Sequence, residues 1–232
     1  MNEKLIAFLK NGELNDLANI IQKIPKASEK DEKAILHVLE DVTNLQARAN
    51  LLMYPQLIPE KERYKILLDG LMEVKHTYFV LAALVGIECI PQSAFFEPLG
   101  LKIIDEIWRI LHQYQGVIAE RASTFIADTL WHVDHTIAPR VMQLLGHQSN
   151  IVQHNALVAL IPLLGLVNIK NEIGAAVGRG DLNQQAQITA LKKLNTIKGF
   201  SDDTLDEETF DIGILGVSLL PYIPNMDDYE HP

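Results

Sequence analysis

The chain has 232 residues, of which 48% are hydrophobic and 22% charged, a composition that suits a folded protein and excludes an intrinsically disordered one. Its single cysteine, Cys89, excludes an intramolecular disulfide framework and is expected to be a buried core thiol in a reducing compartment. No apolar stretch reaches the roughly 18–20 residues that a membrane span needs, so a soluble, cytoplasmic protein is expected.

The net charge of −10 is concentrated at the C-terminal end. All 20 Lys and Arg lie within residues 1–200, whereas residues 201–232 hold nine Asp and Glu and no basic side chain. The acidic segment is expected to be a solvated tail, a flap over a positive patch of the same chain, or an electrostatic handle for a basic partner. Nucleic-acid binding is not expected, because it needs clustered cations and only the pair Lys192–Lys193 stands out.

Apolar residues recur at helical spacing along nearly the whole chain, and no alternating strand pattern appears. In the first half the pattern predicts a helix over Leu45–Leu52 and another that begins at Pro59-Glu60. Tyr78–Ile90 is apolar on almost every face, as expected of a helix packed between neighbours. The next helix has a clear apolar stripe, formed by Ile103, Ile104, Ile107, Trp108 and Leu111.

The second half contains a loose repeat. Val117–Leu130 aligns without gaps onto Ile151–Leu164, 34 positions later, and Asn183–Leu194 follows Val152–Leu163 at a step of 31. Such periods are typical of stacked supersecondary units that share one core. The predicted helices alternate with short, often glycine-containing turns and cover residues 117–132, 137–146, 150–165, 169–178 and 183–198.

Two of these units resemble HEAT repeats. Ile137–Gly165 has a first helix with Pro139 near its start, a short polar turn, and a second helix rich in Ala and Leu. Ile169–Gly199 has the same layout, and Leu101–Val133 is similar more loosely. The resemblance implies an all-α solenoid of stacked helical hairpins. The resemblance covers about 100 residues. The chain is expected to form one helical-repeat domain over residues 1–200, which is irregular over 1–100 and HEAT-like over 101–200. The acidic segment 201–232 follows this domain.

The pattern departs from the family at the positions that normally link neighbouring units. His147 and Gln148 stand where the turn Asp is expected, and the usual Arg of the second helix is replaced by Ala119, Gln153 and Gln184. The Asp–Arg ladder is therefore expected to be absent, and apolar packing alone to hold the units together.

In HEAT proteins the second helices line the concave surface, where partners commonly bind. The resemblance therefore implies a partner-binding row on these helices. Its members are the polar residues at four-residue spacing and their repeat equivalents: Glu120, Thr124, Asp128, His132, His154, Gln185, Thr189 and Lys193. Acids of the C-terminal segment are also expected to contact the partner, as an electrostatic handle: Asp202, Asp203, Glu207 and Glu208. The alternative interpretation is a solvated face with no partner.

Other chemistry is weakly indicated. His132, Asp134 and His135 could hold a transition metal with a further ligand, which would indicate a metal-dependent enzyme, although no complete metal motif is present. Arg179-Gly180-Asp181 is expected to be a turn in which Asp181 caps the next helix. A HEAT-like DNA glycosylase is a weaker alternative, since those proteins resemble basic clamps.

The leading hypothesis is a non-enzymatic protein–protein interaction module, a scaffold or adaptor, without a cofactor. A narrower version is an immunity- or antitoxin-type inhibitor that covers a basic protein, with the acids steering association. The sequence leaves the oligomeric state open.

Overall fold

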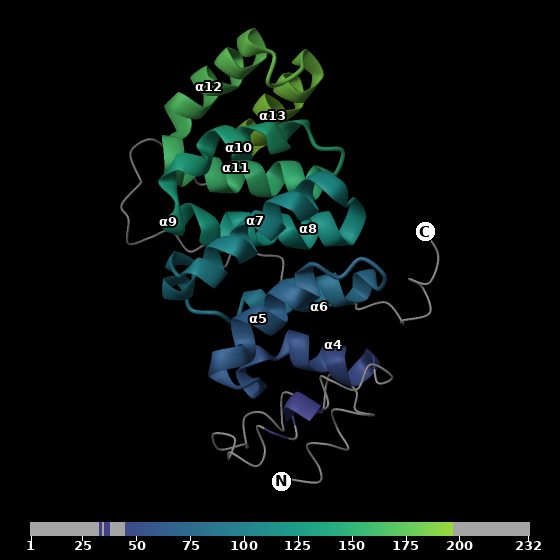
Figure 1. Ribbon diagram of the computed structural model, residues 1–232. Helices are drawn as coiled ribbons and strands as arrows, with labels where there is room; N and C mark the ends of the chain where they lie inside the picture. The colour runs from purple at the N-terminus through teal and green to yellow at the C-terminus, as the bar shows by residue number, and fades with distance from the viewer. Residues whose placement is uncertain (1–32, 34, 38–44, 197–232) are drawn as a thin grey trace. The chain divides into compact units, whose positions relative to one another are not determined.

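The computed structural model describes Lys33, residues 35–37 and residues 45–196, and every regular element within these residues is helical (Figure 1). The first part contains α4 (Leu45–Met53), η1 (Pro55–Leu57), α5 (Glu60–Leu71), α6 (Thr77–Ile87), η2 (Gln92–Phe96) and α7 (Pro98–Gln113). The second part contains α8 (Gly116–Phe125), η3 (Ile126–Leu130), α9 (Trp131–Val133), η4 (His135–Ile137), α10 (Ala138–Gln143), η5 (Leu144–Gly146), α11 (Asn150–Leu164), α12 (Leu166–Arg179) and α13 (Gln184–Thr196). The all-α prediction is confirmed for this part of the chain.

The described residues divide into two compact units, and the division falls within the sequence of α7. The first unit ends at Arg109 and the second begins at Ile110. Whether residues 1–200 act as the single repeat domain predicted from the sequence stays a prediction.

In the first unit α6 packs against both α4 and α5. Eight of its residues are buried, as the apolar composition of Tyr78–Ile90 predicts. The contact with α4 is very close at Gly86, where an added Cβ would lie 1.9 Å from the carbonyl oxygen of Leu52. The backbones of the two helices therefore touch at a point where only glycine fits.

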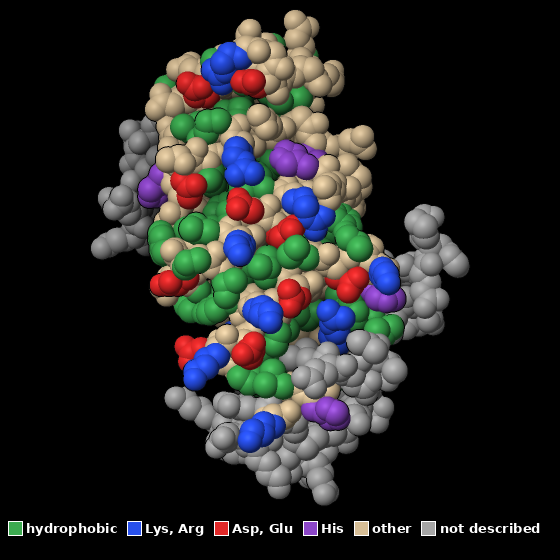
Figure 2. All heavy atoms as spheres, in the orientation of Figure 1, with side chains coloured by type: hydrophobic (Ala, Val, Ile, Leu, Met, Phe, Trp, Pro, Cys, Tyr) green, Lys and Arg blue, Asp and Glu red, His purple; other side chains and the backbone are tan. Residues whose placement is uncertain are grey.

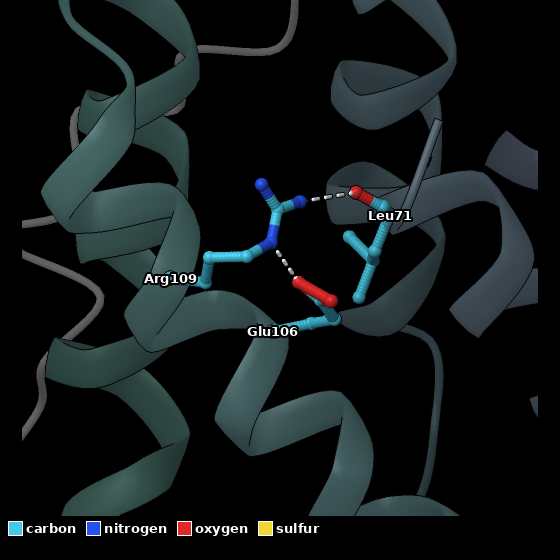
Figure 3. A network of polar contacts seen from close by, with 3 residues as sticks. All are labelled: Leu71, Glu106 and Arg109. Atoms are coloured by element: carbon cyan, nitrogen blue, oxygen red, sulfur yellow. Dashed lines mark hydrogen bonds and ion pairs between the residues drawn. The ribbon is translucent and has the colours of Figure 1, made fainter. Parts of the chain in front are cut away.

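An arginine of α7 donates a hydrogen bond to a backbone carbonyl at the C-terminal end of α5 (Figure 3). Arg109 forms an ion pair with Glu106 one turn earlier, and its Nη2 donates a hydrogen bond to the carbonyl oxygen of Leu71, 3.1 Å away. The last carbonyls of a helix have no partner within that helix, so this bond stabilises the C-terminal turn of α5.

In the second unit the helices follow the predicted ranges closely. Ser149 caps α11, because its Oγ accepts hydrogen bonds from the backbone N–H groups of Ile151 and Val152. A single residue, Gly165, connects α11 to α12, and the chain turns by 117° there. This sharp connection requires a backbone conformation with φ 75° and ψ 152°.

Two local predictions are wrong. Cys89 is exposed, because α6 ends at Ile87 and leaves the cysteine in the following turn. The cap of α13 is Asn183, whose Oδ1 accepts from the N–H of Ala186 at 2.8 Å. Asp181 instead pairs with Arg179, which explains why the Arg-Gly-Asp sequence is held as a closed turn.

Within the described residues no single helix is long and apolar enough to cross a membrane. Only α11 and α12 taken together reach that length and composition, across their 117° bend. Residues 1–32 and the acidic segment 201–232 lie outside the described residues.

Candidate functional site

The predicted row of polar residues begins on α8, which continues through the π-helical turn η3 into α9. In a 3.6-residue helix, side chains four positions apart drift steadily around the axis. A π turn holds more residues per turn, so it reduces this drift between Glu120 and His132. The π turn, which the sequence does not predict, therefore keeps Glu120, Thr124, Asp128 and His132 closer to one face.

Helices α8 and α11 lie side by side and parallel, joined by polar contacts. Ser149 Oγ donates to Glu120 Oε1 at 2.8 Å, near the start of both helices. Further along, Asn155 Nδ2 donates to Ser123 Oγ at 2.8 Å, and Ser123 is fully buried. Both contacts join positions 29–32 residues apart, close to the 34-residue step of the sequence repeat.

These contacts correct the expectation that apolar packing alone holds the units together. Glu120, Ser123, Ser149 and Asn155 form a polar ladder between α8 and α11. Of these residues only Glu120 is in the predicted row, where it was assigned to partner binding. Among Ser123, Ser149 and Asn155, only Ser149 has a recognisable sequence signal, because a serine is a favoured N-cap residue before a helix such as α11.

Helix α13 does not continue the repeat in register. Lys193 Nζ donates to the backbone and side-chain oxygens of Asn150, at 2.9 and 3.1 Å, and to Gln153 Oε1 at 2.9 Å. The sequence alignment would place Lys193 beside Pro162, about 18 Å further along α11 at 1.5 Å per residue. The 31-residue correspondence therefore does not persist in the arrangement of the helices.

The remaining members of the row differ in exposure. Asp128, His132 and Gln185 are exposed, whereas Thr124, His154 and Thr189 are half-buried. Thr124 and Thr189 donate back to backbone carbonyls of their own helices, those of Glu120 and Gln185. Asp202, Asp203, Glu207 and Glu208 lie outside the described residues.

The pKa values of two exposed members, Asp128 and His132, are shifted from their ordinary values. Partial burial raises the pKa of the Asp128 carboxyl, although nearby Arg121 acts in the opposite direction. The ring of His132 lies against that of the half-buried Trp131, with centroids 3.4 Å apart and the planes tilted by 30°. Burial and the neighbouring His135 both lower the pKa of His132. Trp108, by contrast, is in the core as predicted.

The three weak metal candidates do not meet as a ligand set. Asp134 Oδ1 accepts hydrogen bonds from the N–H and the hydroxyl of Thr136, at 2.8 and 2.6 Å, and so caps η4. Among the residues that the structure describes, no three His, Cys, Asp or Glu side chains are placed to bind one metal ion.

The ladder provides a direct test of the α8–α11 pairing. Replacing Glu120 and Ser149 by Ala, singly and together, should give a coupling free energy of about 1 kcal/mol, because the hydrogen bond joins a carboxylate to a half-buried hydroxyl. Ser149→Ala alone should cost about 1 kcal/mol more through loss of the cap. Urea unfolding of the four proteins measures both effects, with Lys170→Ala on α12 as the non-contacting partner in a control cycle. Strict additivity of Glu120→Ala and Ser149→Ala would mean that the contact contributes nothing.

No protein-family model matches this chain, and no curated protein or solved structure is detectably similar to it.

Proposed function

We propose that the chain is a non-enzymatic protein-interaction module of HEAT-like, α-solenoid type. Its binding surface is the outward face of α8, η3, α9 and α11. We define this second-helix surface by Val117, Asp128, His132, Ile151 and His154.

The observation that carries the proposal is that exposed apolar and polar side chains share this surface. Val117 and Ile151, 34 residues apart, occupy equivalent positions in the first turns of parallel helices and are 49% and 38% exposed. Val117 and Thr124 are seven residues apart and so lie on one side of α8. Asp128 and His132 extend the same surface toward the C-terminal end of that helix. Mixed apolar and polar surfaces of this kind are typical of protein interfaces.

The polar ladder beneath the surface supports the same function. Binding costs free energy when side chains and helices must be ordered on association. Here the Glu120–Ser149 and Ser123–Asn155 contacts hold α8 and α11 in place before any partner arrives. A preordered surface loses less entropy on binding.

The expected partner is a protein. In the narrower version of the proposal, this partner is a basic protein that the chain inhibits. Support comes from the nine acids of residues 201–232, which would attract a cationic surface and accelerate encounter. On the described residues, cations and anions are interspersed over the face in Figure 2. Neither sign dominates that face, so steering is assigned to the acidic segment.

The test is affinity capture by the full chain from a lysate of its native host, compared with surface variants. Val117→Asp combined with Asp128→Lys should reduce capture of the stoichiometric partner at least about tenfold, through loss of an apolar contact and reversal of a charge. Asp69→Lys, on the exposed side of α5, is the matched charge control and should capture normally. Failure to recover any stoichiometric protein, or equal recovery by all three proteins, would contradict the proposal.

A further inference from the structure

The first turn of α11 depends on a histidine that must be neutral. His147, in the turn before α11, accepts a hydrogen bond at Nδ1 from the backbone N–H of Ser149, 3.0 Å away. A ring nitrogen that accepts a hydrogen bond carries no proton, so the single proton of the ring is on Nε2. Protonation would place an N–H at Nδ1, facing the N–H of Ser149, and the hydrogen bond would be lost.

The surroundings of His147 favour this neutral form. Burial has the largest effect and lowers the pKa of His147; Glu120 of α8 raises it, and His112 at the end of α7 lowers it. His147 Nε2 is buried and has no hydrogen-bond partner among the described residues, so no acceptor there stabilises the charged ring. The net direction is a pKa below the ordinary value for histidine.

The same turn also holds α13. Gln153 Nε2 donates to the carbonyl oxygen of His147 at 2.6 Å, while Gln153 Oε1 accepts from Lys193 Nζ at 2.9 Å. One glutamine side chain thus links the histidine turn to α13. Lys193 has further bonds to Asn150 in the first turn of α11.

A second histidine lies beside this attachment. His154 is half-buried, and its pKa is lowered first by burial and then by the ammonium group of Lys193. Protonation of His154 would place two positive charges together where α13 meets α11. Both histidines therefore oppose the attachment of α13 once they are charged.

We infer that the first turn of α11 is an acid-sensitive latch, in which protonation of His147 and His154 opens the turn and releases α13 from α11. The pairing of α8 with α11 survives, because it also includes the buried Ser123–Asn155 contact. The pKa of each histidine is lower in the folded chain than its ordinary value. The neutral rings therefore stabilise the attachment of α13 fully above the ordinary pKa, and this stabilisation is lost as the pH falls through the lowered pKa. The latch is independent of any partner.

The experiment is amide hydrogen exchange of the full chain between about pH 7.5 and pH 5, corrected for intrinsic exchange. Protection of α13 should fall at least about tenfold more than that of α8 and the second half of α11. The variant His147→Asn, His154→Gln should abolish this difference. Asparagine can accept the Ser149 N–H in an Asx-turn but does not titrate. An α13 whose protection is independent of pH, or falls equally in the variant, would overturn the inference.

If the double variant does not fold, the ¹⁵N shifts of the His147 and His154 rings in the wild-type chain provide the second measurement. Loss of α13 protection should follow the protonation of these rings with the same midpoint. Protonation of both rings with α13 still protected would overturn the latch equally well.

Discussion

Replacing Gly86 by alanine should destabilise the first unit by about 3 kcal/mol or more. The new Cβ would lie 1.9 Å from the Leu52 carbonyl oxygen and 3.1 Å from a methyl carbon of Leu67. The first atom belongs to the backbone of α4 and cannot rotate away, so α4 and α6 must separate and lose contacts along their length. Thermal unfolding, together with hydrogen exchange of residues 45–109, measures the loss.

The matched control is Gly174→Ala in α12. Its Cβ would meet only the side-chain nitrogen of Gln187, at 4.0 Å, and the position is exposed. Alanine has the higher helix propensity, so this variant should gain about 0.5–1 kcal/mol. A Gly86→Ala variant as stable as the wild-type chain would refute the close approach of α4 and α6.

Gly165→Ala should destabilise the second unit by about 1–3 kcal/mol. No atom lies within 4 Å of the added Cβ, so neighbouring side chains do not contribute to this cost. It comes from the backbone, because φ 75° with ψ 152° is a conformation that essentially only glycine adopts. Relieving the strain would alter the 117° turn between α11 and α12. Urea unfolding followed by circular dichroism measures the change.

Gly180 separates this backbone effect from a general effect of removing glycine. Its φ of 80° and ψ of 8° are in the left-handed helical region, which asparagine also tolerates. Gly180→Asn should therefore cost well under about 1 kcal/mol, whereas Gly165→Asn should cost nearly as much as Gly165→Ala. Equal costs for asparagine at the two positions would contradict the assigned conformation of Gly165.

Helix positions in this chain could be predicted because they follow from local patterns. Apolar spacing and the glycine turns are sufficient for α10 through α13, and the apolar composition of Tyr78–Ile90 is sufficient to bury α6. The orientation of α13 could not be predicted in the same way. An alignment of Asn183–Leu194 with Val152–Leu163 compares apolar positions, whereas the angle between two helices depends on which side chains interlock and on the connecting turns.

The candidate site was predictable only in part for a related reason. Spacing correctly places Asp128 and His132 on an exposed face, but it does not reveal that Glu120 and Lys193 bond to neighbouring helices. Those bonds join residues 29 and 43 positions apart and depend on three-dimensional proximity. The π turn at Ile126–Leu130 has no recognisable sequence signal here either.

The buried hydroxyl of Ser123 has a consequence for how the chain reaches its native arrangement. Aliphatic residues line both α8 and α11, and hydrocarbon surfaces can slide past each other by one turn at little cost. Such a slip would break the hydrogen bond between the Asn155 amide and the buried Ser123 hydroxyl, at a cost of about 0.5–1.5 kcal/mol. The Ser123–Asn155 pair thus favours one alignment of α8 and α11 among several that apolar contacts alone would permit.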